Sequence, residues 1–179
     1  MSNISKNSIA LIGFMGTGKS TIGKVLAKFL GDDYRFIETD QLIVQEVGKS
    51  IPIIFAKDGV SKFREYESLI CERVSNLKKV VISCGGGVVL NKTNIENLKK
   101  NCHIVLLKAT PEEIYKRILK NGKETRPILD KEDPKREIKK ILNLRKSYYD
   151  DAAEIVIYTS NKKIKNIVRE IVIKTKLKT

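Results

Sequence analysis

The sequence predicts an α/β domain built on a mostly parallel sheet of about five strands, with helices covering its faces. Two observations support this fold class. Short apolar runs, typical of buried parallel strands, alternate with longer stretches in which apolar residues recur at helical spacing. No internal repeat, low-complexity tract or linker interrupts this alternation, so we expect residues 1–179 to form a single domain.

The strands are predicted from short, largely apolar runs that are too brief for amphipathic helices. In order along the chain, these runs are 9–12, 34–37, 80–83, 103–107 and 154–158. The first and third runs lead directly into glycine-rich segments. In a parallel sheet both segments would lie at the carboxyl edge, where ligands of such sheets bind.

The helices are predicted from apolar residues at helical spacing. In order, they are expected at 20–30, 41–47, 51–57, 60–77, 91–100, 111–120, 134–149 and 162–174. Gly31 is typical of a helix end, and Thr110-Pro111 with Glu113 is typical of a helix start. The stretch 121–134 is polar and rich in turn-forming residues, which predicts a mobile loop.

The composition narrows the possible function classes. A formal net charge of +14 makes nucleic acid a partner to consider. However, residues 160–179 carry seven Lys or Arg and one Glu, on the polar face of the predicted terminal helix, and aromatic residues make up only 6%. We therefore expect no specific nucleic-acid partner. With neither a membrane-length apolar run nor a signal-peptide core in the sequence, we expect no membrane association and a cytoplasmic location.

The cysteines and the histidine do not suggest a metal site. Cys71, Cys84 and Cys102 are odd in number and far apart, which suits neither a disulfide framework nor zinc ligation. His103 lies in a predicted strand with no pattern of metal-ligand spacing around it. We expect no disulfide framework or zinc site among these cysteines and no catalytic or metal-ligating role for His103.

A phosphate-binding loop lies between the first strand and the first helix. Gly13 to Ser20 fits the pattern G-x-x-x-x-G-K-[ST]. Glycines let backbone N–H groups converge on phosphates, and the helix N-terminus adds its dipole. Lys19 is expected to reach the β and γ phosphates and Ser20 to ligate Mg²⁺. A chance glycine-rich turn would rarely have both flanking elements, so the sequence predicts nucleotide binding.

Carboxylates follow the second predicted strand, at Glu38 and Asp40. A carboxylate beside a γ-phosphate can deprotonate or orient an acceptor hydroxyl, and another can hold the water shell of a metal ion. Alternatively, Thr39 or Asp40 caps the helix that follows. The sequence leaves both interpretations open.

The third strand ends in the segment Gly85-Gly86-Gly87, and a helix nearby carries Arg64 and Glu67. Bare backbone N–H groups could approach a ligand at the glycines, or the glycines could simply form a tight turn. Arg64 and Glu67 are three residues apart beside the apolar stripe of their helix. They form either a surface ion pair or an arginine that is oriented towards an anion.

An arginine interrupts the apolar stripe of the helix predicted at 134–149. Ile138, Ile141 and Leu142 form the stripe, whose next step falls on Arg145, before Tyr148. A charge at this phase either extends outwards to solvent or faces a polar cavity that supplies an anion. The planar fork of arginine suits a carboxylate.

Another arginine, Arg126, precedes Pro127 in the long polar loop. It is either a solvated side chain or a lid arginine that closes over phosphates.

Taken together, these motifs resemble the shikimate kinase family, which has the P-loop nucleoside-monophosphate-kinase-like fold. The resemblance rests on the phosphate loop 13–21, Thr39-Asp40, Phe63-Arg64-x-x-Glu67, glycines 85–87, Arg126-Pro127 and Arg145. It covers nearly the whole chain and implies a three-layer α/β/α fold, with substrate-binding helices at about 41–77 and a mobile lid at about 121–134. It also implies ATP-dependent phosphorylation of the 3-hydroxyl of shikimate, a step in chorismate and aromatic amino acid biosynthesis.

The resemblance implies roles for individual residues. The residues expected to bind ATP are Gly16, Thr17, Gly18, Lys19, Ser20, Thr21, Arg117, Arg126 and Lys162. Those expected to bind shikimate are Asp40, Arg64, Gly85, Gly86, Gly87 and Arg145, with Glu67 bracing Arg64. Lys19, Asp40 and Arg126 would be catalytic. Ser20 would hold Mg²⁺ directly and Glu38 through water, although the family usually has Asp where this chain has Glu38.

Other functions are less consistent with these motifs. The nearest alternative is another small-molecule kinase of the same fold, acting on gluconate or a nucleoside monophosphate. A nucleotide-dependent nucleic-acid-binding protein is a more distant alternative, motivated by the charge. We expect a monomer whose partners are ATP, Mg²⁺ and shikimate.

Overall fold

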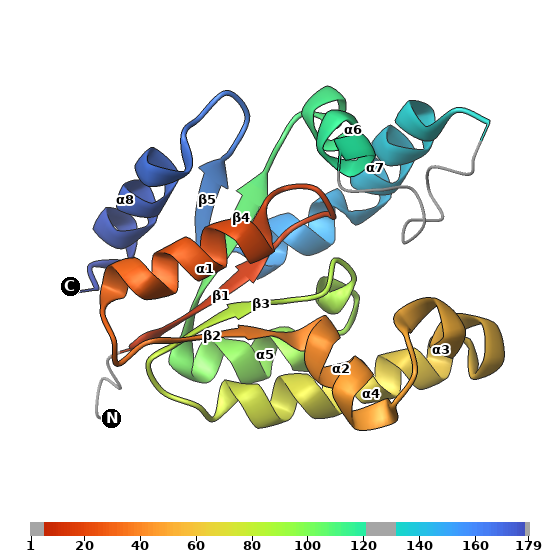
Figure 1. The fold of residues 1–179 in the computed structure, drawn as a ribbon, viewed down its shortest axis with the longest axis horizontal. Helices are drawn as coiled ribbons and strands as arrows, with labels where there is room; N and C mark the ends of the chain where they lie inside the picture. The colour runs from red at the N-terminus through yellow and green to blue at the C-terminus, as the bar shows by residue number, and fades with distance from the viewer. Residues whose placement is uncertain (1–5, 121–131, 178–179) are drawn as a thin grey trace.

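The computed structural model of the chain describes residues 6–120 and 132–177. At its centre is one sheet made of β1 (Ser8–Ile12), β2 (Arg35–Glu38), β3 (Val80–Ser83), β4 (Cys102–Lys108) and β5 (Ile155–Tyr158). The strand order is β2-β3-β1-β4-β5, and each neighbouring pair is parallel (Figure 1). The predicted α/β fold with five strands is confirmed, and the described strands are all parallel.

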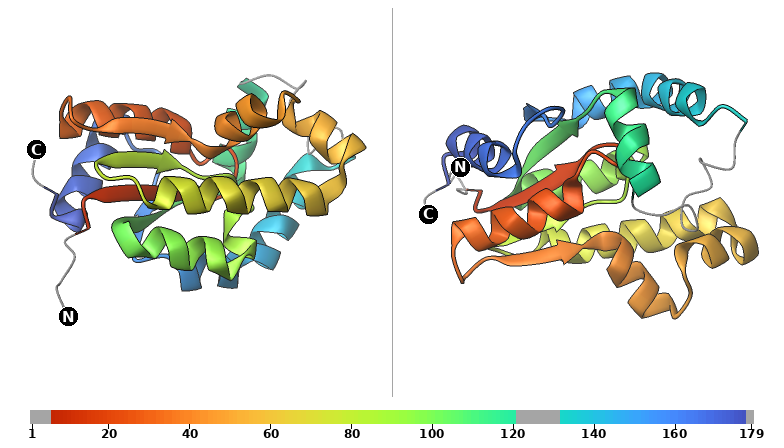
Figure 2. Two further views of the ribbon diagram at one scale, coloured as in Figure 1. Left: turned by 90° about the horizontal axis from the view of Figure 1, so that it is seen from below. Right: turned by 45° about the horizontal axis from the view of Figure 1, so that its top comes forward.

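Helices cover both faces of this sheet, as expected for a three-layer fold (Figure 2). One face is covered by α1 (Lys19–Leu30) and α8 (Ile164–Thr175), and the other by α4 (Gly59–Ser75), α5 (Lys92–Asn101) and α7 (Pro134–Ala152). The remaining helical segments are α2 (Thr39–Val47), α3 (Ile51–Lys57), the 3₁₀ turn η1 (Val88–Leu90) and α6 (Pro111–Lys120).

The central strand β1 divides the core in two. Ile9 and Leu11 pack with α1 and α8, whereas Ala10 and Ile12 pack in the cluster that contains α4 and α5. All four side chains are 0% exposed. Successive strand residues point to opposite faces, so a strand covered on both faces must be apolar throughout. This explains the uninterrupted apolar run at the start of the sequence.

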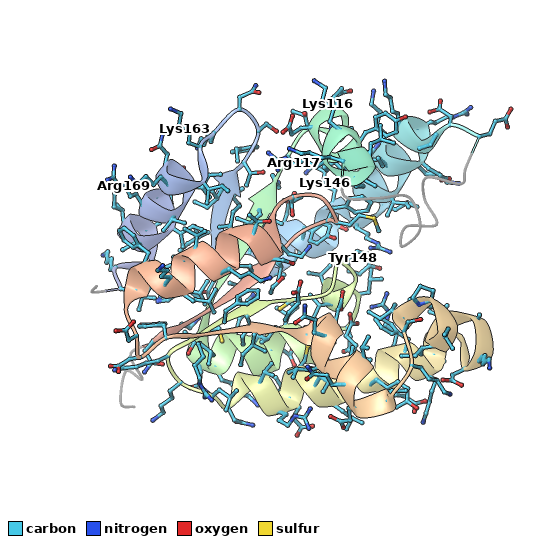
Figure 3. The ribbon with its side chains drawn as sticks, viewed as in Figure 1. Lys116, Arg117, Lys146, Tyr148, Lys163 and Arg169 are labelled. Atoms are coloured by element: carbon cyan, nitrogen blue, oxygen red, sulfur yellow. The ribbon has the colours of Figure 1, made fainter. Side chains whose placement is uncertain are left out.

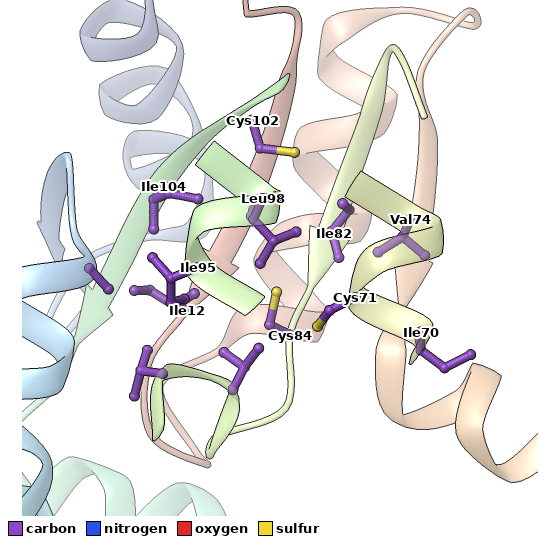
Figure 4. Packing of buried hydrophobic residues seen from close by; sticks show 14 of the residues in the cluster. Ile12, Ile70, Cys71, Val74, Ile82, Cys84, Ile95, Leu98, Cys102 and Ile104 are labelled. Carbon is purple, nitrogen blue, oxygen red and sulfur yellow. The ribbon is translucent and has the colours of Figure 1, made fainter. Parts of the chain in front are cut away.

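The three cysteines lie among apolar side chains (Figure 4). Their thiols are free and buried. Burial raises the pKa of Cys71 and Cys102 to about 12. A thiol that stays protonated is a weak nucleophile, so these residues contribute packing rather than chemistry.

The element ends differ by a few residues from those expected, and η1 was not predicted. Val88 to Leu90 are apolar, and periodicity cannot distinguish such a short turn from a strand. The terminal helix α8 buries Ile167, Val168 and Ile171 against the sheet. Its amphipathic docking, and hence the solvated lysine face, is confirmed.

Within residues 6–120 and 132–177, no helix is long and apolar enough to cross a membrane. The same ranges contain no group of three or more His, Cys, Asp or Glu that could hold a metal ion. His103 lies in β4, with its Nδ1 3.9 Å from a carboxylate oxygen of Glu154.

The connections after β1, β2 and β3 all leave the carboxyl edge of the sheet (Figure 1). They contain the phosphate loop, the Glu38–Asp40 segment and the glycines at 85–87. The parallel topology therefore brings together three motifs that are far apart in the sequence.

Candidate active site

The phosphate loop connects β1 to α1 and is stabilised by its own side chains. Gly18 has φ +100° at the N-cap of α1, a left-handed conformation that favours glycine. The Lys19 ammonium donates to the carbonyl oxygens of Gly13 at 2.7 Å and Phe14 at 3.1 Å, and the Thr17 hydroxyl donates to Phe14 at 2.8 Å. In the described structure no side chain caps α1, so its N-terminal amides and dipole are available to an anion.

Arg117 of α6 contacts this loop directly. Its guanidinium donates to the carbonyl oxygens of Gly16 and Thr17, both at 3.3 Å, and to the hydroxyl of Thr159 at 3.0 Å. Arg117 is therefore beside the donor loop, and its adenine contact remains a prediction. Thr159, just after β5, was not singled out from the sequence. Its buried hydroxyl also donates to the Thr17 carbonyl at 3.1 Å, so it ties β5 to the loop.

Lys162, another predicted ATP-binding residue, has a different partner in the described structure. Lys162 pairs with Glu170 at 2.7 Å on the surface near α8, and its role in adenine binding remains a prediction. Arg126 and most of the predicted lid lie outside the described residues.

The Ser20 hydroxyl donates to a carboxylate oxygen of Glu38. Glu38 ends β2, and Ser20 lies in the first turn of α1. The predicted metal ligands are thus adjacent, and they contact each other directly. Both supply the oxygen atoms that Mg²⁺ prefers.

The helix-capping interpretation of Thr39 and Asp40 is wrong. Helix α2 starts at Thr39, and neither residue caps it. Instead the buried Thr39 hydroxyl accepts the Gly85 N–H at 3.0 Å and lies 3.4 Å from the Ser83 carbonyl oxygen. The end of β2 is therefore attached to the glycine segment after β3.

Asp40 and Glu67 flank Gly85. A Cβ atom at Gly85 would lie 2.7 Å from Asp40 Oδ1 and 2.9 Å from Glu67 Oε1. Both oxygens are buried, and no described group donates a hydrogen bond to either. Burial is the main cause that raises the pKa of each carboxyl group, opposed by Lys19 and Arg64 at Asp40 and by Arg64 at Glu67. Buried oxygens without a hydrogen-bond donor indicate a site that can still accept hydrogen bonds.

Arg64 and Glu67 are not a surface ion pair. Glu67 is 0% exposed, and Arg64 Nη1 donates to its Oε2. The Arg64 side chain retains 26% exposure, so one part of the guanidinium is fixed while another part remains accessible. This arrangement supports the interpretation in which Glu67 orients Arg64.

Arg145 turns inwards rather than out to solvent. Its Nη1 donates to the Gly86 carbonyl oxygen at 3.2 Å. The buried Tyr149, one helical turn later, donates its hydroxyl to the same oxygen at 2.6 Å. Tyr149 was missed because the apolar stripe was continued to Tyr148. The spacing 138, 142, 145, 149 would have found it.

The close approach of neighbouring groups, rather than a left-handed backbone, explains why residues 85–87 are glycines. Gly85, Gly86 and Gly87 all lack a positive φ. A Cβ at Gly87 would overlap the Arg64 guanidinium, and one at Gly85 would collide with two carboxylates. A Cβ at Gly86 would meet only the backbone of the phosphate loop, at 3.6 Å from Met15 N. The middle glycine of the segment therefore lies directly opposite the donor loop.

A cavity of about 290 Å³ lies behind the phosphate loop and is a separate feature. Its walls include Phe14 of the loop, the end of β4, and Leu142 and Tyr149 of α7. Asp40, Arg64 and Glu67 are not among the described residues that line it. These three charged groups of the acceptor site therefore lie outside the cavity.

Asp40→Asn is expected to raise the melting temperature at about pH 8, with the gain disappearing towards about pH 4. The raised pKa means that the folded protein binds this proton more tightly than the unfolded chain. The folded wild-type protein therefore has its full stability below the pKa that Asp40 has in the unfolded chain. It loses stability as pH rises through the pKa that Asp40 has in the folded protein. Asparagine does not titrate. Thermal denaturation of both proteins across this pH range measures the difference, and a gain that is equal at every pH would contradict the expectation.

Comparison with known proteins identifies the family of the chain. A family model described as shikimate kinase matches residues 15–176. A curated shikimate kinase of Caldanaerobacter subterraneus subsp. tengcongensis is 43% identical over 165 residues, which are 92% of this chain and 94% of the relative.

Solved structures lead to the same family. The shikimate kinase from Acinetobacter baumannii, solved in complex with shikimate, aligns with a TM-score of 0.87 at 30% identity over 98% of this chain and 97% of that chain. A gluconokinase from Sinorhizobium meliloti 1021 aligns with a TM-score of 0.62 at 18% identity over 97% and 93%, a likeness of fold alone. The fold is that of a P-loop kinase, and the family model and the alignments with shikimate kinases cover nearly the whole chain. The chain therefore belongs to the shikimate kinase family.

Proposed function

We propose that this protein transfers the γ-phosphoryl group of ATP to the 3-hydroxyl of shikimate, giving shikimate 3-phosphate and ADP. The observation that carries this proposal is the position of Gly86 opposite the phosphate loop, with Arg145 donating to its carbonyl oxygen and Arg64 beside the neighbouring Gly87. A small hydroxylated carboxylate bound there would have its carboxylate near the arginines and a hydroxyl near the donor. The relative from Acinetobacter baumannii was solved with shikimate.

In the donor half of the site, the protein positions phosphates and neutralises their charge. The Lys19 ammonium would bind the phosphates in place of the Gly13 and Phe14 carbonyls that it now contacts. The amides at the start of α1 and the helix dipole act on the same group. Because little covalent chemistry is required of the protein, this positioning supplies most of its contribution on the donor side.

Ser20 and Glu38 are the residues that would hold Mg²⁺. Their oxygens are adjacent, and Mg²⁺ in phosphoryl-transfer sites typically takes few protein ligands, retaining water and phosphate oxygens. When bound, the ion neutralises charge on the phosphates. Glu38 is one methylene longer than the Asp usual in the family, and its carboxylate already reaches the Ser20 hydroxyl.

In the acceptor half, Asp40 would accept the proton of the attacking hydroxyl. Burial raises its pKa, which makes it a stronger base, while the nearby Lys19 and Arg64 favour the charged form. Arg64, oriented by Glu67, and Arg145 would hold the carboxylate of the acceptor. The three groups would therefore fix the hydroxyl in line with the phosphoryl group.

The alternatives identified from the sequence are not favoured. The gluconokinase likeness supports the fold alone, and the shikimate kinase matches cover nearly the whole chain at higher identity. The lysine-rich face belongs to α8, whose apolar face is docked on the sheet. A monomeric state and a cytoplasmic location remain predictions.

A coupled ADP-release assay tests the function. With ATP and Mg²⁺, we expect turnover with shikimate and little with gluconate, AMP or CMP as the acceptor. Absence of turnover above background with shikimate would overturn the proposal. Preferential turnover of gluconate would instead support the nearest alternative.

A further inference from the structure

We propose that Tyr149 is a positioning residue of the acceptor site, which holds the segment 85–87 in its binding geometry through the Gly86 carbonyl. The kinetic part of this inference rests on the proposed function. The contact itself does not, and it can be tested without substrate.

The contact is short and is made by a buried side chain. The Tyr149 hydroxyl donates to the Gly86 carbonyl oxygen at 2.6 Å. The side chain is 4% exposed, and burial raises its pKa to about 12. The hydroxyl therefore stays protonated across the physiological range and acts only as a neutral hydrogen-bonding group.

The glycine segment has no side chains of its own to hold it in place. Thr39 holds its first residue by accepting the Gly85 N–H at 3.0 Å. Tyr149 holds its second residue from α7, the helix that precedes β5, whereas Thr39 lies at the start of α2, directly after β2. These two hydroxyls thus fix a flexible backbone between separate helices.

Tyr149 also determines what Arg145 can do. Both residues donate to the Gly86 carbonyl oxygen, at 2.6 Å and 3.2 Å. Without the tyrosine hydroxyl, Arg145 would be the remaining side-chain donor to that oxygen in the described structure. An arginine that must hold the backbone is less free to bind a carboxylate. Loss of the hydroxyl therefore weakens acceptor binding in two ways, by loosening the glycine segment and by engaging Arg145.

The tyrosine ring belongs to the core cluster that contains α4 and α5, but packing does not enclose it on every side. The ring forms part of the wall of the cavity of about 290 Å³ behind the phosphate loop. A side chain with open space on one side forgoes part of its dispersion contacts, so its position depends more on its hydrogen bond. Removing the hydroxyl should therefore move both the ring and the glycine segment.

Tyr149→Phe tests the inference kinetically. Losing one neutral hydrogen bond predicts a rise of about three- to tenfold in the KM for shikimate, with the KM for ATP and kcat changed less than about twofold. Tyr148→Phe is the matched control, because Tyr148 is adjacent in the sequence but 49% exposed. It should leave all three constants unchanged. Equal changes in both KM values, or the same change in the control, would indicate a general structural effect and overturn the proposal.

Amide NMR of ¹⁵N-glycine-labelled protein tests the contact without substrate. The Gly87 N–H belongs to the same peptide group as the Gly86 carbonyl, so it reports on hydrogen bonds to that oxygen. Its resonance should shift in Tyr149→Phe and stay in place in Tyr148→Phe, with melting temperatures measured alongside. An unshifted Gly87 resonance overturns the inference whatever the substrate is. If the wild-type protein fails to phosphorylate shikimate, the proposed function fails while this measurement still decides the role of Tyr149.

Discussion

Replacing Asp40 with asparagine is expected to lower kcat for shikimate phosphorylation by about 100- to 10,000-fold, the usual contribution of a general base. The carboxylate lies at the junction of the acceptor segment and the donor loop, with one oxygen buried and unpartnered. Asparagine keeps the shape of the side chain but cannot take a proton. Steady-state kinetics with saturating ATP and shikimate measure the loss.

ATP binding by the Asp40→Asn variant should remain intact, because the phosphate loop and Lys19 are unchanged. Calorimetric titration with ADP checks this point. Asp33→Asn removes a carboxylate from a surface ion pair with Lys79 and serves as the control, with expected activity close to wild type. Retained turnover in Asp40→Asn would remove Asp40 from its proposed role. Together with the stability gain expected at high pH, a large loss of kcat would mark a residue kept for chemistry at a cost in stability.

Replacing Arg145 with alanine is expected to raise the KM for shikimate by about ten- to a hundredfold, because hydrogen bonds to a charged group are lost. The KM for ATP should change far less, since Arg145 contacts the glycine segment and not the phosphate loop. Initial-rate kinetics with each substrate varied in turn separate the two effects.

Arg169→Ala is the matched control for this variant. Arg169 is an exposed arginine on α8, on the other side of the molecule from α7 (Figure 3). Its removal should leave both KM values within about twofold of wild type. A selective effect of Arg145→Ala on ATP would contradict the assignment of Arg145 to the acceptor.

The fold could be predicted from the sequence because its signals are local. The five apolar runs became the five strands, and the phosphate loop lies between β1 and α1 as expected. Each signal depends on residues within one or two turns of each other, or on the alternation of neighbouring strand residues. Among residues 6–120 and 132–177, the missed element is the short turn η1, where three apolar residues lack a period.

The candidate site could be predicted only in part. Helical phase identified Arg145 as unusual but could not distinguish a solvated arginine from one that faces the site. The same phase, carried one residue too short, gave Tyr148 instead of Tyr149. For Arg64 and Glu67 the spacing allowed an ion pair, and the burial of Glu67 showed that the pair is an internal one.

By itself, the sequence determined the five-stranded α/β architecture, the phosphate loop and the types of residue available for an acceptor site. The tertiary structure decided how those residues act. It showed that the glycines at 85–87 leave room for Asp40, Glu67 and Arg64, and that Thr39 and Tyr149 attach this segment to α2 and α7. These decisions depend on contacts between residues tens of positions apart, whose burial and distance are set only when the strands pair in the order β2-β3-β1-β4-β5.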